Sequence, residues 1–527
     1  MSFRYYPDHT DQGSTGYART RAFNRMEIGN TGQVLINLSR AIDGDEVYYQ
    51  AECVTGIKTR AKRMIVGILQ MTQLKKYGKN KRGVPIYKMT PLSWKFPPMY
   101  VASTHRDLSE NLLVLVEFHS WTAFEKYPTG ALSRILGRVS ETPVEEVSLL
   151  YKNELFRKPL VLPDLEPVEE ERVEYGINCN ITSIDPLGSE DLDDAFHLSG
   201  DKIYVHIADV DHYIKPHSPA DVLIAPRVTT IYGPTVHHML APDLAEHRLS
   251  LKPGSRKAVM TIELQYRTDL GLVPQKVFPA YIWSNRALTY EVAQDLLWKG
   301  DKDLEAIQKY TGESDTHKIV EHLMVKCNAY IGQLIKDRGG ILRVCSSGKA
   351  AQYVVANGDD RQRHEALNLE NYTHFTSPIR RYADILVART LKGFSYAKEE
   401  LERLAAGINH FNEKTRRYYR DLDILRLYRA VQAKGGLWET EGMVTALSEE
   451  ARVTVHLLEL KLDYTYPLFD DRLSFSITQT GDRFTIGNDV WIPFNEPVSL
   501  VLRSDPAALK LNKRVVLSLK LISFLNF

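Results

Sequence analysis

The 527-residue chain has few cysteines and no long apolar run. Its four cysteines lie far apart and form no Cys-X-X-Cys pair, so the sequence indicates neither a disulfide framework nor a zinc site. No window of about 18 uncharged apolar residues occurs, and the start lacks the basic and apolar regions of a secretory signal. We therefore expect an intracellular protein with reduced thiols and no membrane partner. Its expected compartment is the cytoplasm, with the nucleus and organelles left open.

An excess of charge of one sign is also missing. The chain has 67 Lys+Arg against 66 Asp+Glu, a formal net charge of +1, so only the local distribution of charge can indicate a polyanionic partner. A hydrophobic content of 43%, a charged content of 25% and a mean hydropathy of -0.29 are typical of a globular protein. The length is enough for about three or four domains, each with its own core.

The first 145 or so residues consist of short β-branched and aromatic runs separated by turns, which predicts one or two small β-barrels. Two basic loops lie between these strands, at residues 58–63 and 75–82, and the second contains Tyr77. A solvated hairpin tip is an equally good interpretation of one such loop alone. Several basic loops on small barrels favour single-stranded nucleic acid, because cations follow the backbone and aromatic rings stack on bases.

Beyond the barrels, a proline- and acid-rich stretch at residues 158–174 is typical of a linker. A mixed segment of strands and helices follows to about residue 395, and then a charged helical stretch at 396–433. From Trp438 onward the sequence returns to strands, which predicts another five-stranded barrel, although a small sandwich has the same pattern.

Four aspartates gather in the segment IDPLGSEDLDDA. A predicted strand ends at Asp185, a Pro-Leu-Gly-Ser turn follows, and the next strand begins among Asp191, Asp193 and Asp194. Alternation along this strand puts Asp191 and Asp193 on one face, and the turn can bring Asp185 beside them. Clustered carboxylates repel one another unless a cation neutralises them. Oxygen ligands without nearby Cys or His favour Mg²⁺ or, alternatively, Mn²⁺.

Two other interpretations of this segment stay open. The first is a solvated acidic turn. The second, an EF-hand calcium loop, is poorer because its glycine is missing and Lys202 stands where its terminal glutamate should be. Clustered carboxylates suit a two-metal phosphoryl-transfer site, for which the target would be a phosphodiester.

A second informative segment, HFTSPIRRYADIL, predicts a helix start. Thr376 or Ser377 is the expected N-cap, Pro378 fits the first helical position, and Arg380 and Arg381 fall in the first turn. Cations oppose the helix dipole there, unless they help to bind an anion such as phosphate. The alternative is an arginine paired with an acidic neighbour, which has more weight for Arg381 than for Arg380.

Four motifs appear together in an order that resembles the RNB family of exoribonucleases, which includes ribonuclease II, ribonuclease R and the catalytic exoribonuclease of the eukaryotic exosome. They are the aspartate cluster, VHIADV at 205–210, LTYE at 288–291 and HFTSPIRRYAD at 374–384. Weaker matches, RAIDGD at 40–45 and YPTG at 127–130, resemble turns of the family's two cold-shock barrels.

The resemblance implies a multidomain α+β fold. Its parts would be two cold-shock-like OB barrels, a central mixed α/β RNB catalytic domain and a C-terminal S1-like OB barrel. The predicted ranges are, in that order, 1–80, 81–157, 158–435 and 436–527.

It also implies a Mg²⁺-dependent, hydrolytic and processive 3′-to-5′ exoribonuclease, which releases nucleoside 5′-monophosphates from single-stranded RNA by a two-metal mechanism. The family's four metal-site aspartates match Asp185, Asp191, Asp193 and Asp194 one for one. Arg380 matches the arginine that holds the scissile phosphate.

Further substrate-binding residues follow from the same resemblance. Tyr290 and Tyr232 fall where the family has aromatics that stack on 3′-terminal bases, although Tyr290 has the alternative role of a core tyrosine at a helix start. Glu321 resembles another substrate-contacting glutamate, and Arg381 is counted with this group.

The chain departs from the family in several places. The helical lobe before the HFTSP motif is shorter, which puts the channel depth and the length of the final product in doubt. Ala388 stands where a histidine is common, and Val228 stands where a glycine is common. The chain lacks room for the exosome subunit's preceding nuclease and tethering domain, so exosome association is not implied, and the protein partners are unknown.

Two rivals to the exoribonuclease are considered. The first is a catalytically silent RNB-fold RNA-binding regulator. Proteins of that kind typically lose the acidic set, whereas all four aspartates are present here. The second is a metal-dependent phosphoesterase that acts on small molecules, which would leave the flanking barrels and their basic loops without a purpose.

Overall fold

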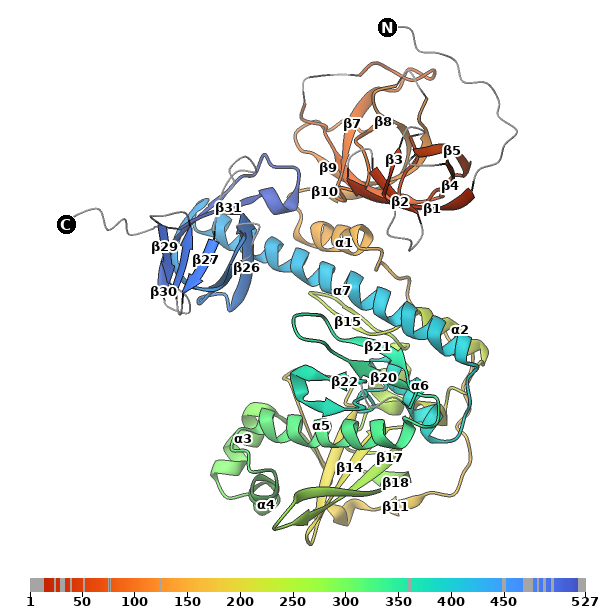
Figure 1. The fold of residues 1–527 in the computed structure, drawn as a ribbon, viewed down its shortest axis with the longest axis vertical. Coiled ribbons are helices and arrows are strands. Elements are labelled where there is room, and N and C mark those ends of the chain that lie inside the picture. The colour runs from red at the N-terminus through yellow and green to blue at the C-terminus, as the bar shows by residue number, and fades with distance from the viewer. Residues whose placement is uncertain are drawn as a thin grey trace, which may run out of the picture. The chain divides into compact units, whose positions relative to one another are not determined.

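The computed structural model describes most of residues 14–519. The residues outside the description within this range are 23–24, 29–33, 38–39, 51–52, 74, 76, 123–124, 359–361, 448–451, 468–476, 481–482, 487–489 and 494–496. The chain divides into two compact units, one of residues 1–156 with 416–527 and the other of residues 157–415 (Figure 1).

The first unit begins with two closed five-stranded barrels. The strands of the first barrel are β1 (Ser14–Ala22), β2 (Arg25–Ile28), β3 (Val34–Asn37), β4 (Glu46–Gln50) and β5 (Cys53–Thr59). Those of the second are β6 (Met64–Leu69), β7 (Ile86–Pro91), β8 (Met99–Ala102), β9 (Leu112–Ser120) and β10 (Thr129–Arg138). In β7 every second side chain is buried, as the two-residue repeat of a strand requires.

The basic loop at residues 75–82 belongs to the second barrel, in which it connects β6 to β7. The predicted boundary between the two barrels, residue 80, falls within this loop. The strand β6 was therefore predicted to belong to the first barrel, but it pairs with β7 and β9 of the second. A charged loop marks a surface connection equally well between domains and within one, so composition alone did not locate the boundary.

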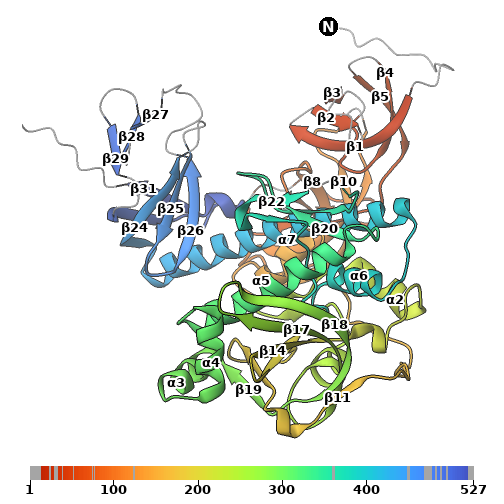
Figure 2. The ribbon, with the colours of Figure 1, turned by 60° about the horizontal axis from the view of Figure 1, so that its bottom comes forward.

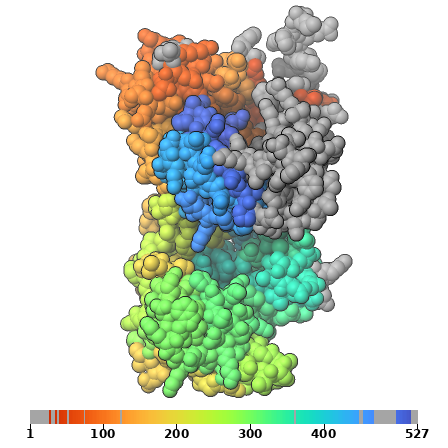
Figure 3. All heavy atoms as spheres, turned by 90° about the vertical axis from the view of Figure 1, so that its left-hand side faces the viewer, coloured from red at the N-terminus to blue at the C-terminus, as the bar shows by residue number. Residues whose placement is uncertain are grey.

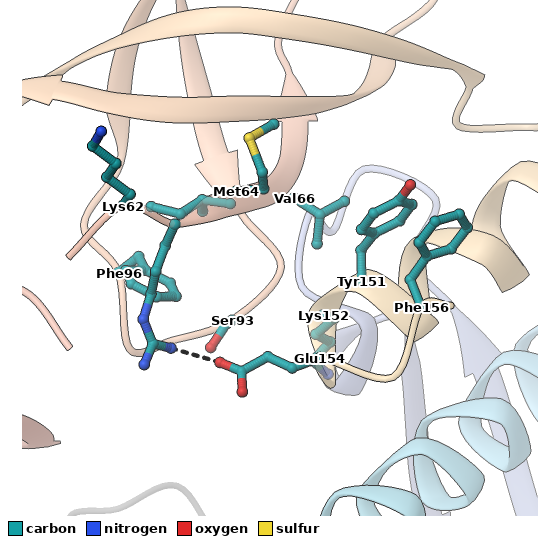
Figure 4. A pocket seen from close by; sticks show the side chains of 11 residues that line it. Lys62, Met64, Val66, Ser93, Phe96, Tyr151, Lys152, Glu154 and Phe156 are labelled. Carbon is teal, nitrogen blue, oxygen red and sulfur yellow. Dashed lines mark hydrogen bonds and ion pairs between the residues drawn. The ribbon is translucent and has the colours of Figure 1, made fainter. Parts of the chain in front are cut away.

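The helix α1 (Thr142–Lys152) follows the second barrel, and a cavity of about 340 Å³ lies beside it (Figure 4). Tyr151 and Phe156 stack at the edge of this cavity with ring centroids 4.1 Å apart. Arg63 pairs with Glu154 across 2.6 Å, and Lys152 pairs with Asp421 across 2.7 Å. These ion pairs leave little uncompensated charge in the cavity, which contains none of the predicted site residues.

The C-terminal strands of the first unit form a five-stranded antiparallel sheet in the order β26-β25-β24-β30-β31. The strands are β24 (Leu437–Leu447), β25 (Arg452–Leu457), β26 (Leu462–Pro467), β30 (Pro497–Ser504) and β31 (Val515–Leu519). A separate three-stranded sheet contains β27 (Ile477–Thr480), β28 (Arg483–Ile486) and β29 (Val490–Pro493). The predicted strands are therefore present, and closure of these sheets into a barrel is not seen among the described residues.

The second unit is built on a seven-stranded mixed sheet in the order β11-β18-β17-β14-β13-β12-β19 (Figure 2). Its strands are β11 (Val173–Tyr175), β12 (Thr182–Asp185), β13 (Asp194–Ser199), β14 (Lys202–Ala208), β17 (Arg256–Arg267), β18 (Gly271–Trp283) and β19 (Arg286–Thr289). Three small hairpins complete the strands: β15 (Ile231–Tyr232) with β16 (Val236–His237), β20 (Ile341–Val344) with β21 (Gln352–Val355), and β22 (Arg363–His364) with β23 (Leu369–Glu370).

Helices pack against this sheet. They are α2 (Pro219–Ile224), α3 (Tyr290–Trp298), α4 (Lys302–Thr311), α5 (Thr316–Ile335), α6 (Tyr382–Leu391) and the start of α7 (Lys398–Ala433). One hydrophobic core joins the sheet to these helices. The helix α6 lies deep in that core, since nearly all of its residues are buried, whereas α3 and α4, in green, face solvent in the space-filling view (Figure 3).

All four cysteines are free thiols. Among the described residues, no helix combines the length and the apolar character that a membrane crossing requires.

Candidate active site

The ends of two parallel strands bring the first site residues together. β12 ends at Asp185 and β19 ends at Thr289, and these two residues are partners in the parallel register. Thr289 caps α3 by accepting a hydrogen bond from Val292 N, so Tyr290 begins the helix directly beside Asp185. Parallel strands end at the same edge of a sheet, and that edge carries the site.

The other three aspartates stand at the start of β13, but not on one face of it. The strand begins at Asp194, and Asp191 and Asp193 lie in the loop before it. The prediction that strand alternation aligns Asp191 with Asp193 is therefore wrong. The loop is held by other bonds instead: Leu192 N donates to Ser250 Oγ at 3.0 Å, and Ala208 N donates to Asp193 O at 2.9 Å.

Asp193 joins the acidic motif to the basic motif. Arg380 Nε donates to Asp193 Oδ2 at 2.9 Å, and Ile379 N donates to Asp193 Oδ1 at 2.7 Å. Asp193 is 2% exposed, so both of its oxygens are satisfied away from solvent. Arg380 Nη2 donates to Ser377 Oγ at 3.1 Å, which fixes the plane of the guanidinium group. Two motifs 187 residues apart in sequence thus form one site.

The helix that follows starts later than predicted. α6 begins at Tyr382 with the extended residue Arg381 as its N-cap, and the two arginines precede its first turn. The reason is a strand-like contact with the segment 228–230. Tyr382 N donates to Val228 O at 2.7 Å, and Thr230 N donates to Arg380 O at 3.0 Å. These bonds hold Arg381 extended between the turn at 378–380 and the helix, so the predicted N-caps Thr376 and Ser377 do not cap this helix.

The partner segment is strained at Val228, which has a φ of 57°. A β-branched residue rarely adopts a positive φ, and a glycine, common in the family at this position, would adopt it freely. The surroundings maintain this conformation, because Arg157 Nη2 donates to the carbonyl oxygens of Arg227 and Thr229. Backbone strain of this kind clusters at functional sites. Nothing in the composition of the segment identified it as part of the site.

Two predicted residues contribute differently from the rest. Arg381 Nη2 donates to Asp384 Oδ1 at 2.7 Å. This arginine is therefore paired with an acidic neighbour, which was the alternative to an anion-binding role. Glu321 is exposed on α5 and makes none of the contacts that join the aspartates to Arg380 among the described residues.

The aspartates carry more buried negative charge than Arg380 can balance. Burial, together with the charges of Asp194 and Asp191, raises the pKa of Asp185 to about 7, although Arg380 opposes the shift. Burial also raises the pKa of Asp194, to about 6. Asp185 Oδ2 is buried without a hydrogen-bond partner among the described residues. A divalent cation would relieve this excess.

The donor set fits a hard cation such as Mg²⁺, since all four side chains are carboxylates. Among the described residues, however, no three His, Cys, Asp or Glu side chains are arranged around a common metal position. Asp193 faces Arg380 and Asp191 faces Tyr232, so these two carboxylates hydrogen-bond to protein groups.

The two predicted aromatics lie at this site, each with a contact that the sequence did not indicate. The Tyr290 ring stacks on His317, the second residue of α5, with centroids 3.8 Å apart and planes at 10°. The Tyr232 hydroxyl donates to Asp191 Oδ2 at 2.7 Å. Burial and the negative charges of Asp194 and Asp185 raise the pKa of the Tyr290 phenol. Both tyrosines therefore lie near the acidic cluster.

The residues of this site lie within a match to a known domain family. Residues 177–311 and 344–396 match the RNB domain, and these ranges include the four aspartates, Tyr232, Tyr290 and both arginines. The chain contains an RNB domain. Residues 86–154 match a second description, the Dis3-like cold-shock domain 2, which corresponds to most of the second barrel and α1.

Individual proteins are also similar to this chain. The human exosome complex exonuclease RRP44 is 24% identical over 455 residues, which is 64% of this chain and 47% of that protein. The chain thus spans about half the length of the curated relatives it matches. A Mycoplasma genitalium RNase R structure with ribose-methylated single-stranded RNA aligns with a TM-score of 0.75 and 17% identity, covering 96% of this chain and 100% of that one.

Yeast Ssd1, described as a pseudonuclease, aligns with a TM-score of 0.66 and 14% identity, covering 96% of both chains. At these identities the two structures establish the fold alone. The fold of this chain is thus shared by a protein named as an RNase and by one described as a pseudonuclease.

Proposed function

We propose that this chain is a Mg²⁺-dependent, hydrolytic and processive 3′-to-5′ exoribonuclease that degrades single-stranded RNA to nucleoside 5′-monophosphates. The observation that carries the proposal is the contact of Asp193 with Arg380 and Ile379, which joins the acidic cluster to the phosphate-binding motif inside an RNB domain. The relatives named exonucleases support the activity.

In this proposal Asp185, Asp191, Asp193 and Asp194 hold two ions, with Mn²⁺ as an alternative to Mg²⁺. When bound, the ions would supply Lewis-acid charge and a water of lowered pKa. The chain's own contribution is positioning. Asp193 and Ser377 fix the plane of the Arg380 guanidinium, whose side chain is 44% exposed. Its Nη1 has no hydrogen-bond partner among the described residues and can donate to a phosphate oxygen. A fixed cation stabilises charge that develops on the scissile phosphate.

A basic aromatic surface on the second barrel supports RNA as the substrate. Tyr77, Tyr100 and Tyr127 form a continuous cluster, with ring centroids 5.1 and 5.6 Å apart. Lys75 lies over the Tyr77 ring, and Lys88 lies over the Tyr127 ring. Lysines over aromatic rings place cations beside the surfaces on which bases stack.

The position of this surface on the barrel strengthens the argument. With β6 as the first strand, Tyr77 lies in the loop between the first and second strands, and Tyr127 lies in the loop between the fourth and fifth. Lys88 and Tyr100 belong to the second and third strands. OB-type barrels bind oligonucleotides on this combination of strands and loops.

A second candidate is an RNA-binding protein without catalysis. The similarity to Ssd1 and the absence of a ready metal-ligand arrangement among the described residues favour it. The four aspartates argue against it, because a protein that only binds RNA has no need for buried carboxylates that raise one another's pKa.

The deciding experiment is a time course on 5′-labelled single-stranded RNA with Mg²⁺ or EDTA, run beside the Asp193→Asn protein and a DNA of matching sequence. The nuclease should leave short 5′-labelled products and release nucleoside monophosphates from RNA, in the wild type and with metal only. Tight RNA binding without metal-dependent shortening would establish the non-catalytic candidate. Equal cleavage by wild type and Asp193→Asn would overturn the assignment of the metal site.

A further inference from the structure

The hydrogen bond between Tyr232 and Asp191 gives Tyr232 a second feature besides its aromatic ring. The hydroxyl donates to Asp191 Oδ2 at 2.7 Å, across 41 residues of sequence. The residue as a whole is 41% exposed. One end of this side chain thus contacts a carboxylate of the acidic cluster, and its ring faces solvent.

The backbone around Tyr232 is well fixed. Tyr232 lies in the short hairpin of β15 and β16, directly after the segment 228–230 that bonds to Arg380. Met239 N donates to Thr230 Oγ1 at 3.0 Å, which ties the far side of the hairpin to the same segment. The position of the phenol oxygen is therefore coupled to the backbone that also places Arg380.

The direction of the bond is fixed as well. A tyrosine phenol ordinarily titrates at about pH 10, so its hydroxyl carries a proton to donate at neutral pH, whereas an ionised carboxylate has none. The carboxylate is the acceptor, and only Oδ2 is engaged by this hydroxyl.

We propose that Tyr232 is a positioning residue for the metal site: its hydroxyl holds Asp191 Oδ2 and thereby directs Oδ1 towards the bound cation. The inference rests on the proposed function, since it takes Asp191 as a ligand. Hydrogen-bond partners of ligating carboxylates fix ligand orientation, and their loss typically weakens metal binding 10- to 100-fold. Because a base would stack on the ring of this same residue, Tyr232 links the 3′ end of the RNA to the orientation of a metal ligand.

The test measures Mn²⁺ binding to the full chain without RNA, from the electron paramagnetic resonance signal of free Mn²⁺. Tyr232→Phe removes only the hydroxyl, and Tyr232→Leu also removes the ring. Tyr266→Phe is the matched control, because Tyr266 loses the same atom from a ring stacked on Tyr310, with no contact to the aspartates among the described residues. RNA binding in EDTA and the melting temperature are measured for every variant.

We expect Tyr232→Phe to weaken Mn²⁺ binding at least about 10-fold, with unchanged RNA binding in EDTA and unchanged melting temperature. Any RNA cleavage that this variant loses should return at higher Mn²⁺. Tyr232→Leu should weaken both Mn²⁺ and RNA binding, and Tyr266→Phe should weaken neither.

Two results would overturn the inference, and they are distinguishable. If wild type and Tyr232→Phe bind Mn²⁺ equally, Tyr232 does not position a ligand, and the proposed nuclease site stands. If wild type binds no more Mn²⁺ than Asp193→Asn does, the metal site itself is wrong and this inference fails with it.

Discussion

The acidic site of the second unit and the basic aromatic surface of the second barrel hold their charges in opposite ways. In the site, Asp193 is 2% exposed and both of its oxygens accept hydrogen bonds from fixed donors. On the barrel, Lys75 and Lys126 are exposed and lie over tyrosine rings. The site is a set of charges fixed before substrate arrives, whereas the barrel surface is a set of adaptable contacts.

This difference corresponds to two physical tasks. Stabilising a transition state requires donors that do not have to reorganise, so each charge needs partners that fix it. Holding a single strand of any sequence requires stacking and cations that follow a flexible backbone. Changes in the site should therefore alter turnover by large factors, and changes on the barrel should alter affinity by smaller ones.

A large loss of turnover with little loss of RNA affinity is expected from Arg380→Ala. If Arg380 supplies a fixed cation at the scissile phosphate, as proposed, its loss should lower single-turnover cleavage by a factor on the order of 10²–10³, comparable to losing an oxyanion donor. RNA affinity should change far less, since the barrel contacts remain. The measurements are the single-turnover rate with Mg²⁺ and the dissociation constant in EDTA. An unchanged rate would remove Arg380 from the mechanism.

On the barrel, Tyr77→Ala combined with Tyr127→Ala should weaken binding of a long single-stranded RNA. Each lost stacking contact is worth about 1–3 kcal/mol, so affinity should fall by at least about 5-fold per tyrosine. Single-turnover cleavage of RNA bound at saturation should be unchanged. Trp94→Ala is the control, because Trp94 is an exposed aromatic of the same barrel outside the tyrosine cluster. An equal loss of affinity in the control would show that the tyrosine cluster is not a specific binding surface.

The sequence predicted those features of the site and of the strands that depend on residues near one another in the chain. The spacing of the four aspartates and the HFTSPIRRYAD motif predicted two parts of one site, and the structure joins them through Asp193. Strand content in both barrels was also predictable, because burial alternates along β7.

What the sequence could not show are contacts between distant segments. The late start of α6 depends on backbone bonds from Val228 and Thr230 to residues 380–382. The Tyr232 bond to Asp191 and the stacking of Tyr290 on His317 likewise join segments separated by 41 and by 27 residues. No local propensity encodes such pairs, because they arise only when the sheet has placed both partners.

A third prediction concerns the cost of the site's uncompensated charge. Asp185→Asn should abolish cleavage and yet stabilise the metal-free protein, because it removes a negative charge that burial and the neighbouring carboxylates Asp194 and Asp191 disfavour. A gain of about 1 kcal/mol would raise the melting temperature by about 2–4 °C. Thermal unfolding in EDTA and in Mg²⁺ measures this effect. Mg²⁺ should stabilise the wild type and not the variant.

The effect should depend on pH. The pKa of Asp185 in the fold, about 7, lies above its ordinary value of 3.8, so the folded chain retains a proton that the unfolded chain releases between these values. The contribution of Asp185 to the free energy of unfolding of the wild type therefore falls as the pH rises from about 4 to about 7. The advantage of Asp185→Asn in EDTA should be absent near pH 4 and complete above pH 7. A constant difference would exclude the carboxylate charge as its cause.

The smallest expected effect is on the salt dependence of RNA binding. Lys126 is exposed over the Tyr127 ring, where it can neutralise one phosphate of a bound strand. Replacing it in Lys126→Gln should reduce the slope of log affinity against log salt by about 0.7, the value for one phosphate contact on a single strand. Lys215→Gln, an exposed lysine of the second unit, should leave the slope unchanged. Because a lost counterion changes the slope and a lost stacking contact does not, titrations of Lys126→Gln and Tyr127→Ala at several salt concentrations separate the two contributions of this surface. Equal slopes for Lys126→Gln and wild type would place the RNA phosphates elsewhere on the barrel.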